Sequence, residues 1–152
     1  MNPQAAQNYL RTKVLTATPE QLQLLLFDGA LRFGEQARLA LNSQNYEQSF
    51  QLITRTQKII NELICSLKHE ISPDLCGKLA ALYSYAYRKL VEANTNHKIE
   101  PLDEAINVLR FQRETWVMLL DKLAKQKATI AAQKMDMPLP DARMETTISL
   151  QS

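Results

Sequence analysis

The stretch LTATPEQLQLLLFDGAL, residues 15–31, decides the fold that this chain is expected to adopt. Thr18 is placed to cap a helix, Pro19 follows at the first helical position, and Gln21 stands three residues after Thr18, as a capping box requires. Apolar residues then recur at helical spacing. These signals predict a helix that begins at Pro19 and runs to about Leu41, before a turn-like NSQN.

This predicted helix is apolar on two faces, although a bundle helix needs only one. At about 100° per residue, six small or apolar residues share one face and three more fall nearly opposite. The first face holds Leu22, Leu25, Leu26, Gly29, Phe33 and Ala37, and the second holds Leu24, Phe27 and Leu31. Burying three such side chains is worth on the order of 5–8 kcal/mol, so something should cover the second face. The N-terminal arm, the rest of the bundle and a partner protein are all candidates, because periodicity does not identify the cover.

Three further helices are predicted over residues 46–70, 73–94 and 101–127. Ser72 and Pro73 repeat the signal of a capping residue followed by proline, and the apolar positions of each segment follow the helical period. No segment resembles a strand. Four helices of similar length joined by short turns predict an all-α chain folded as an antiparallel four-helix bundle.

The two ends of the chain differ in composition from the predicted bundle. Residues 1–17 are rich in Asn and Gln, with isolated apolar positions, and predict a loosely structured, flexible N-terminal arm. Residues 128–152 contain two prolines, show no helical stripe and predict a disordered tail. The expected domain organisation is therefore an arm over 1–17, a helical bundle over 18–127 and a tail over 128–152.

The residues needed for catalysis or metal binding are scarce. The two histidines, His69 and His97, fall in predicted turns, and no Glu is followed by His three positions later, as a di-iron bundle would require. Hydrolase, phosphate-binding and zinc-protease motifs are also absent from the sequence. We therefore expect no enzyme activity, no catalytic residues, no metal site and no cofactor.

Charge and hydropathy limit which partners and which cellular compartment are expected. The net charge is +2, with Lys and Arg scattered among acids, so a nucleic-acid partner is not expected. No apolar run is long enough to span a membrane, and no secretory signal begins the sequence, so we expect a cytoplasmic protein without membrane insertion. Cys65 and Cys76 fit no metal-binding spacing and are expected to be reduced, buried, small apolar residues.

One charge interrupts an apolar stripe. Arg113 lies between Leu109 and Trp116 in the last predicted helix, where an unpaired charge should not be buried. We expect Arg113 to extend its charged end to solvent or to pair with an acid of a neighbouring helix.

Three segments resemble the flagellin export chaperone family, FliS. They are Val14–Gly29 with Tyr9 upstream, IINELICSL at residues 59–67, and LYSYAYRKLVEAN at residues 82–94. The resemblance spans about residues 9–120 in order. It implies a mainly four-helix bundle that binds the disordered C-terminal segment of flagellin in the bacterial cytosol, prevents premature polymerisation and delivers the subunit to the flagellar type III export apparatus.

The resemblance also implies site residues, named here by their positions in this sequence. The expected partner-binding residues are Leu22, Leu25, Leu26, Asp28, Gly29, Ile60, Ile64, Tyr83, Tyr87 and Leu90. Tyr9, Leu10 and Val14 of the arm are expected to form a displaceable cap over the binding groove. Other flagellar export or regulatory proteins are further candidate partners.

A second hypothesis stays open at this point. The chain could be a regulatory helical bundle that binds another flagellar protein or an anti-sigma factor. Exchange of partners in a binding assay would distinguish the two hypotheses.

Overall fold

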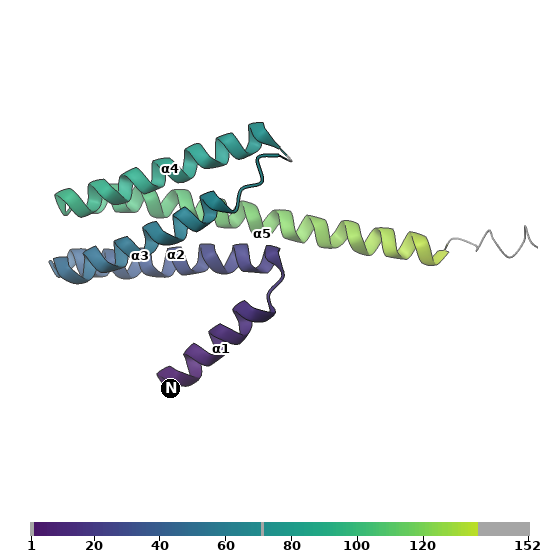
Figure 1. Ribbon diagram of the computed structural model, residues 1–152, viewed down its shortest axis with the longest axis horizontal. Helices are drawn as coiled ribbons and strands as arrows, with labels where there is room; N and C mark the ends of the chain where they lie inside the picture. Colours follow the sequence, from purple (N-terminus) through teal and green to yellow (C-terminus); the bar gives the residue numbers. More distant parts are fainter. Residues whose placement is uncertain (1, 71, 137–152) are drawn as a thin grey trace, which may run out of the picture. The chain divides into compact units, whose positions relative to one another are not determined.

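The computed structural model describes residues 2–70 and 72–136, which form five helices and no strand (Figure 1). The helices are α1 (Pro3–Thr16), α2 (Pro19–Asn42), α3 (Tyr46–Cys65), α4 (Pro73–Asn96) and α5 (Ile99–Asp136). The chain divides into two units, Met1–Val117 and Met118–Ser152, and each is described by itself. In the second unit, the described residues 118–136 continue α5 and are exposed, with Leu120 half-buried.

The start of α2 has the predicted capping box. The Gln21 backbone N–H donates to the Thr18 hydroxyl oxygen at 3.2 Å, and the Thr18 backbone N–H donates to the Gln21 side-chain oxygen at 3.0 Å. Pro19 occupies the first turn, where its missing N–H leaves no bond unmade. The first turn of α2 is therefore stabilised by local contacts that the sequence already encodes.

Replacing Thr18 with alanine is expected to lower the free energy of unfolding by about 0.5–2 kcal/mol, because the Gln21 N–H loses its acceptor. Thr115→Ala is the matched control, since Thr115 is exposed in the interior of α5 and its hydroxyl bonds only within the helix, to the Phe111 carbonyl. Urea denaturation followed by circular dichroism measures both variants. Equal stability of the two variants would contradict a stabilising role for the cap.

Contacts between the helices establish their directions. Along α2 and α5 the paired side chains are Arg38 with Asp103, Glu35 with Arg110, and Asp28 with Arg113, so one helix ascends as the other descends. Between α2 and α3, Ser66 lies against Gln23, with their side-chain oxygens 3.3 Å apart. The start of α3 also meets the end of α4, where the Tyr46 and His97 rings stack with centroids 4.0 Å apart. The predicted all-α, antiparallel four-helix bundle is confirmed.

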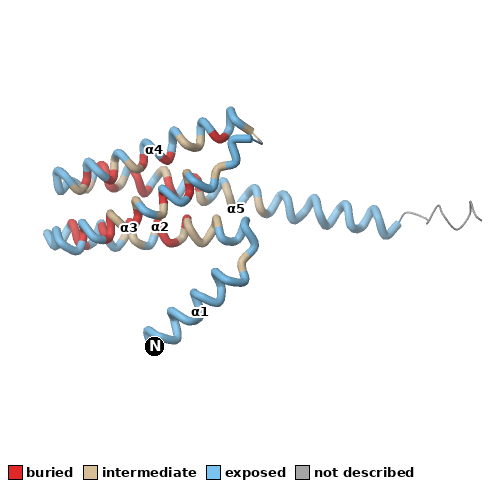
Figure 2. Tube along the Cα trace, viewed as in Figure 1, coloured by how far each residue is buried: buried red, intermediate tan, exposed pale blue. Residues whose placement is uncertain are grey.

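The core lies between α2, α3, α4 and the first half of α5 (Figure 2). Its largest fully buried side chains are Tyr83, Phe27, Ile53, Ile60, Leu63, Leu90, Leu102 and Leu109. Alanines at the same interfaces, such as Ala30 and Ala86, let the helices approach closely. This core defines which predicted site residues a partner can reach.

Several predicted helix limits were wrong. Residues 3–16 are helical rather than loosely structured, because the Asn2 side chain caps the Gln4 N–H and no glycine or internal proline interrupts the segment. Helix α3 ends at Cys65 instead of about Glu70, since the Ser66 hydroxyl donates to the Leu63 carbonyl and competes with further helical bonding.

The C-terminal helices extend further than predicted. Helix α4 ends at Asn96, two residues beyond the prediction, with His97 in the left-handed conformation that commonly ends a helix. Helix α5 continues through residues 128–136, which were predicted to be disordered, because Ala, Lys and Gln favour helix even without an apolar stripe. The remainder of the predicted tail, residues 137–152, lies outside the described residues.

Two smaller predictions were also corrected. Cys76 is buried as expected, but Cys65 is exposed because it faces outward at the end of α3; both are free thiols. Ser72 stands at the N-cap of α4, but its side chain makes no capping hydrogen bond.

Candidate functional site

Helix α2 has its second apolar face covered by its own bundle. Phe27 is 1% exposed and packs near Tyr83 of α4, with ring centroids 6.4 Å apart. Leu31 packs against the same core, and Leu24 is half-buried. Of the three candidate covers, the bundle itself is the one that this structure contains.

The N-terminal helix α1 leaves its apolar side chains open to solvent (Figure 2). The exposed fractions are 70% for Tyr9, 41% for Leu10, 41% for Val14 and 73% for Leu15. The predicted cap residues therefore cover no groove in this conformation, and their capping role stays a prediction.

The predicted partner-binding residues fall into two groups. Gly29, Ile60, Tyr83 and Leu90 are buried in the core, so a partner cannot touch them while the bundle is closed. The others are accessible: Leu22 is exposed, and Leu25, Leu26, Asp28, Ile64 and Tyr87 are half-buried. Substitutions in the first group test folding, whereas substitutions in the second group can test binding.

The accessible apolar residues of α2 lie beside the end of α3. Leu22 and Leu26 are one helical turn apart, and Gln23 between them contacts Ser66, two residues after Ile64. Leu26 and Ile64 both pack against the core from its edge. The accessible apolar surface is defined as Leu22, Leu25 and Leu26 of α2. Ile64 lies about 200° around α3 from Ser66, so it is a separate half-buried residue at the edge of the core.

Two glycines position α2 against its neighbours. A Cβ on Gly29 would stand 3.3 Å from Cδ1 of Ile59 in α3, and a Cβ on Gly34 would stand 3.1 Å from Cγ1 of Ile106 in α5. Both distances are tighter than ordinary side-chain contacts, so each glycine admits a neighbouring isoleucine. The backbone of α2 therefore approaches its neighbours closely at both Gly29 and Gly34.

Three ion pairs join α2 to α5 along one seam, and Asp28 belongs to one of them. The Arg113 side chain donates to Asp28, which confirms that Arg113 pairs with an acid of a neighbouring helix. The two side chains are 36% and 41% exposed, so solvent screens the pair and its contribution to stability is small. Trp116 adds to the seam by donating its indole N–H to the Glu20 carbonyl at 3.1 Å.

A second polar seam joins α4 to α5. Glu104 accepts a hydrogen bond from the Tyr85 hydroxyl at 2.9 Å and pairs with Lys89 at 3.3 Å. The hydrogen bond from Tyr85 is the main cause that lowers the pKa of Glu104, and the same bond raises the pKa of Tyr85. Tyr85 and Glu104 are exposed and Lys89 is half-buried, so these contacts join the two helices at the surface of the bundle.

Tyr83 is the most perturbed titratable group of the core. Desolvation by burial raises its pKa to about 12, from an ordinary value of 10.0, because the phenolate cannot be hydrated there. Tyr83 is therefore neutral under all ordinary conditions and acts as an apolar core residue.

This shift predicts how stability depends on alkaline pH. The folded state holds the Tyr83 proton more tightly than the unfolded state, so the contribution is complete below about pH 10 and is lost as pH rises toward about 12. The unfolding free energy of the wild type should fall by on the order of 2 kcal/mol relative to Tyr83→Phe across this window. Urea denaturation of both proteins at several pH values tests this prediction. If the unfolding free energies of the two proteins change with pH in parallel, the raised pKa of Tyr83 is contradicted.

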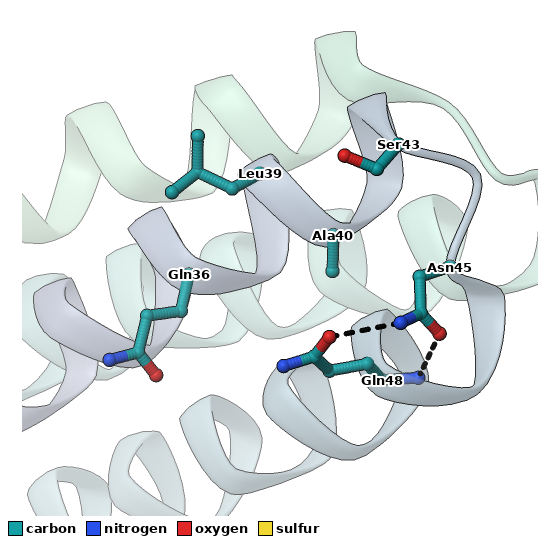
Figure 3. A pocket seen from close by; sticks show the side chains of 6 residues that line it. All are labelled: Gln36, Leu39, Ala40, Ser43, Asn45 and Gln48. Atoms are coloured by element: carbon teal, nitrogen blue, oxygen red, sulfur yellow. Dashed lines mark hydrogen bonds between the residues drawn. The ribbon is translucent and has the colours of Figure 1, made fainter.

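A pocket of about 350 Å³ lies where α2 turns into α3 (Figure 3). It is lined by Gln36, Leu39, Ala40, Ser43, Asn45 and Gln48. The Asn45 side chain accepts from the Gln48 N–H at 3.3 Å and donates to the Gln48 side chain at 3.0 Å, so these polar groups already cap α3. The pocket contains none of the predicted site residues and no titratable side chain.

Among residues 2–70 and 72–136, no group of three or more His, Cys, Asp or Glu side chains is arranged to hold a metal ion. No helix in this part of the chain combines the length and apolar character of a membrane span.

The structure also brings together residues that sequence reasoning did not connect. Arg32 and Arg55 both place their guanidinium groups near the ring of Phe33, at 5.3 and 5.7 Å from its centroid. The adjacency of Arg32 and Phe33 is visible in the sequence, but the approach of Arg55 depends on the register of α2 against α3.

Comparison with known proteins places this bundle in a family. The family model described as "Flagellar protein FliS" matches residues 1–124. The flagellar secretion chaperone FliS of Bacillus subtilis is 32% identical over 126 residues, which cover 83% of this chain and 92% of that protein. The flagellar secretion chaperone FliSB of Pseudomonas aeruginosa is 34% identical over 113 residues, covering 74% of this chain and 90% of that protein.

A solved structure described as a flagellar chaperone from bacteria has the same fold, with a TM-score of 0.64 and 19% identity; the match covers 78% of this chain and 97% of that one. The fold is thus that of a helical-bundle flagellar chaperone. The chain belongs to the FliS family of flagellar secretion chaperones.

Proposed function

We propose that this protein binds the disordered C-terminal segment of flagellin in the bacterial cytosol, prevents its premature polymerisation and delivers it to the flagellar type III export apparatus. Membership of the FliS family supports the proposal. The observation that carries it at the level of residues is the accessible apolar surface of Leu22, Leu25 and Leu26, which the folded bundle leaves partly uncovered.

The physical basis is coupled folding and binding. An amphipathic segment that is unfolded when free buries its apolar side chains on the bundle, and the cost of ordering it reduces the net affinity. While it is bound, the segment cannot pair with other flagellin subunits. The chaperone acts by covering a surface and needs no chemical step.

Calorimetric titration with a peptide that copies the C-terminal segment of flagellin from the same organism tests this proposal. We expect saturable one-to-one binding with a negative heat-capacity change, because apolar surface is buried. A scrambled peptide of the same composition is the control. Equal heats for the two peptides, measured on folded protein, would exclude flagellin as the partner and favour the regulatory-bundle hypothesis.

The capping role of α1 needs a separate variant. Replacing Tyr9, Leu10 and Val14 with serine removes the apolar contacts of a cap, and all three residues are exposed, so the bundle should fold unchanged. If α1 competes with the peptide, this variant binds more tightly than the wild type. Unchanged affinity would show that α1 does not cap the surface.

A further inference from the structure

The face where α2 packs on α3 carries positive charge over an apolar floor. The floor consists of Phe33 and Ile59, which are half-buried; Gly29, against which Ile59 packs, is buried. The guanidinium carbons of Arg32 and Arg55 lie 5.3 and 5.7 Å from the centroid of the Phe33 ring. A terminal nitrogen of Arg32 also lies 4.0 Å from where a Gly29 Cβ would stand.

The acids that could neutralise Arg32 are already paired elsewhere. Asp28 and Glu35 stand four residues before and three residues after Arg32, the spacings at which helix neighbours pair. Asp28 instead bonds to Arg113, and Glu35 bonds to Arg110 at 2.7 Å, both on α5. Within the described part of the chain, Arg32 makes no ion pair.

Arg55 has no acid within its own helical neighbourhood. Gln51 and Leu52 precede it by one turn, and Lys58 and Ile59 follow it by one turn. Lys58 is itself exposed and makes no ion pair among the described residues. By contrast, Arg38, Arg110 and Arg113 on the α2–α5 seam each have a carboxylate partner. Arg32 and Arg55 therefore have no carboxylate partner on the α2–α3 face, although Glu62, seven residues after Arg55, is an exposed acid on the same side of α3.

This face continues the accessible apolar surface. Leu25, Gly29 and Phe33 follow one another at four-residue spacing, so they form one line along α2. A polypeptide that lies on Leu25 can extend along this line to the two arginines. The planar guanidinium groups are suited to receive a carboxylate through paired hydrogen bonds.

We propose that Arg32 and Arg55, over the floor of Phe33 and Ile59, form a docking site for an acidic residue of the bound polypeptide segment. This inference rests on the proposed function, because the occupant is the same flagellin segment. The charge complementarity would orient the segment along α2 and speed its association, while the apolar surface supplies most of the affinity.

A double-mutant cycle tests the site. The wild type and Arg32→Gln/Arg55→Gln are titrated with the flagellin C-terminal peptide and with a copy in which its Asp and Glu are replaced by Asn and Gln. The paired substitution should weaken binding of the native peptide about five- to twentyfold at low salt, and the loss should shrink at high salt. For the amide peptide, the two proteins should bind with equal affinity.

A variant with the same change in charge is the control. Lys122→Gln/Lys127→Gln removes two exposed cations of α5, both in the second unit of the chain, and should leave peptide affinity unchanged. Arg32→Lys/Arg55→Lys keeps the charge but loses the planar fork, and should bind with intermediate affinity. Circular dichroism and the urea midpoint should show that every variant is folded.

The possible results separate the site from the proposed function. If the wild type binds the native peptide and the Arg→Gln variant binds it equally well, the docking site is wrong and the proposed function stands. If Arg32→Gln/Arg55→Gln and Lys122→Gln/Lys127→Gln lose peptide affinity equally, the effect is one of net charge and the docking site is also wrong. If the wild type binds neither peptide, the proposed function fails, and the docking site fails with it.

Discussion

Phe27→Ala should lower the free energy of unfolding by about 3–5 kcal/mol, because it deletes a large side chain from a closed core. Phe27 is 1% exposed and packs near Tyr83, so the cavity it leaves lies between α2 and α4 and cannot fill with solvent at low cost. For a domain of this size, such a loss is a large fraction of the total stability.

Phe111→Ala is the matched control for this experiment. Phe111 is 64% exposed on α5, so its removal should change stability by no more than about 0.5 kcal/mol. Urea denaturation monitored by circular dichroism measures both variants. Equal losses of stability would show that Phe27 does not lie in the core. The second apolar face of α2 would then be exposed to solvent and not covered by the bundle.

Ile60→Ala is expected to have the second largest effect, a loss of about 2–5 kcal/mol. Ile60 is fully buried in α3, although the family resemblance implies a role in binding. If the variant is folded, its affinity for the flagellin peptide should be close to that of the wild type, because no atom of Ile60 is accessible to a partner.

Ile64→Ala, one turn further along α3, should give the opposite pattern. Ile64 is half-buried at the edge of the core and open to a partner, so its loss should cost less stability and more peptide affinity. Denaturation and calorimetry on the two variants separate the roles of core and surface. Loss of affinity in the folded Ile60 variant alone would mean that the bundle opens when it binds.

The helix starts were predictable because their signals are local. Thr18, Pro19 and Gln21 encode a capping box that depends on three residues and no tertiary contact, and it forms as predicted. Helix ends were less predictable. Helix α3 ends at Cys65 because the Ser66 hydroxyl donates a hydrogen bond to the Leu63 carbonyl. Helix α5 continues to Asp136 through helix-forming residues that have no apolar stripe.

The candidate site was only partly predictable for a related reason. Periodicity placed Leu22, Leu25 and Leu26 on one face of α2, and these residues are accessible in the fold. The same periodicity could not distinguish Ile60, which is buried, from Ile64 one turn later, which is accessible. The difference depends on how far each side chain lies from the neighbouring helices, and no local signal reports that distance.

The sequence by itself determined that this protein is an all-α bundle, that α2 begins at Pro19, and that Arg113 must either reach solvent or pair with an acid. Each of these follows from interactions within one helix or from the cost of burying a charge. Only the tertiary structure decided that the bundle itself covers Phe27, that Asp28 is the partner of Arg113, and that Arg55 joins Arg32 at Phe33. These depend on the register between helices, which is set by packing around residues such as Gly29 and Gly34, and packing is a property of the whole core.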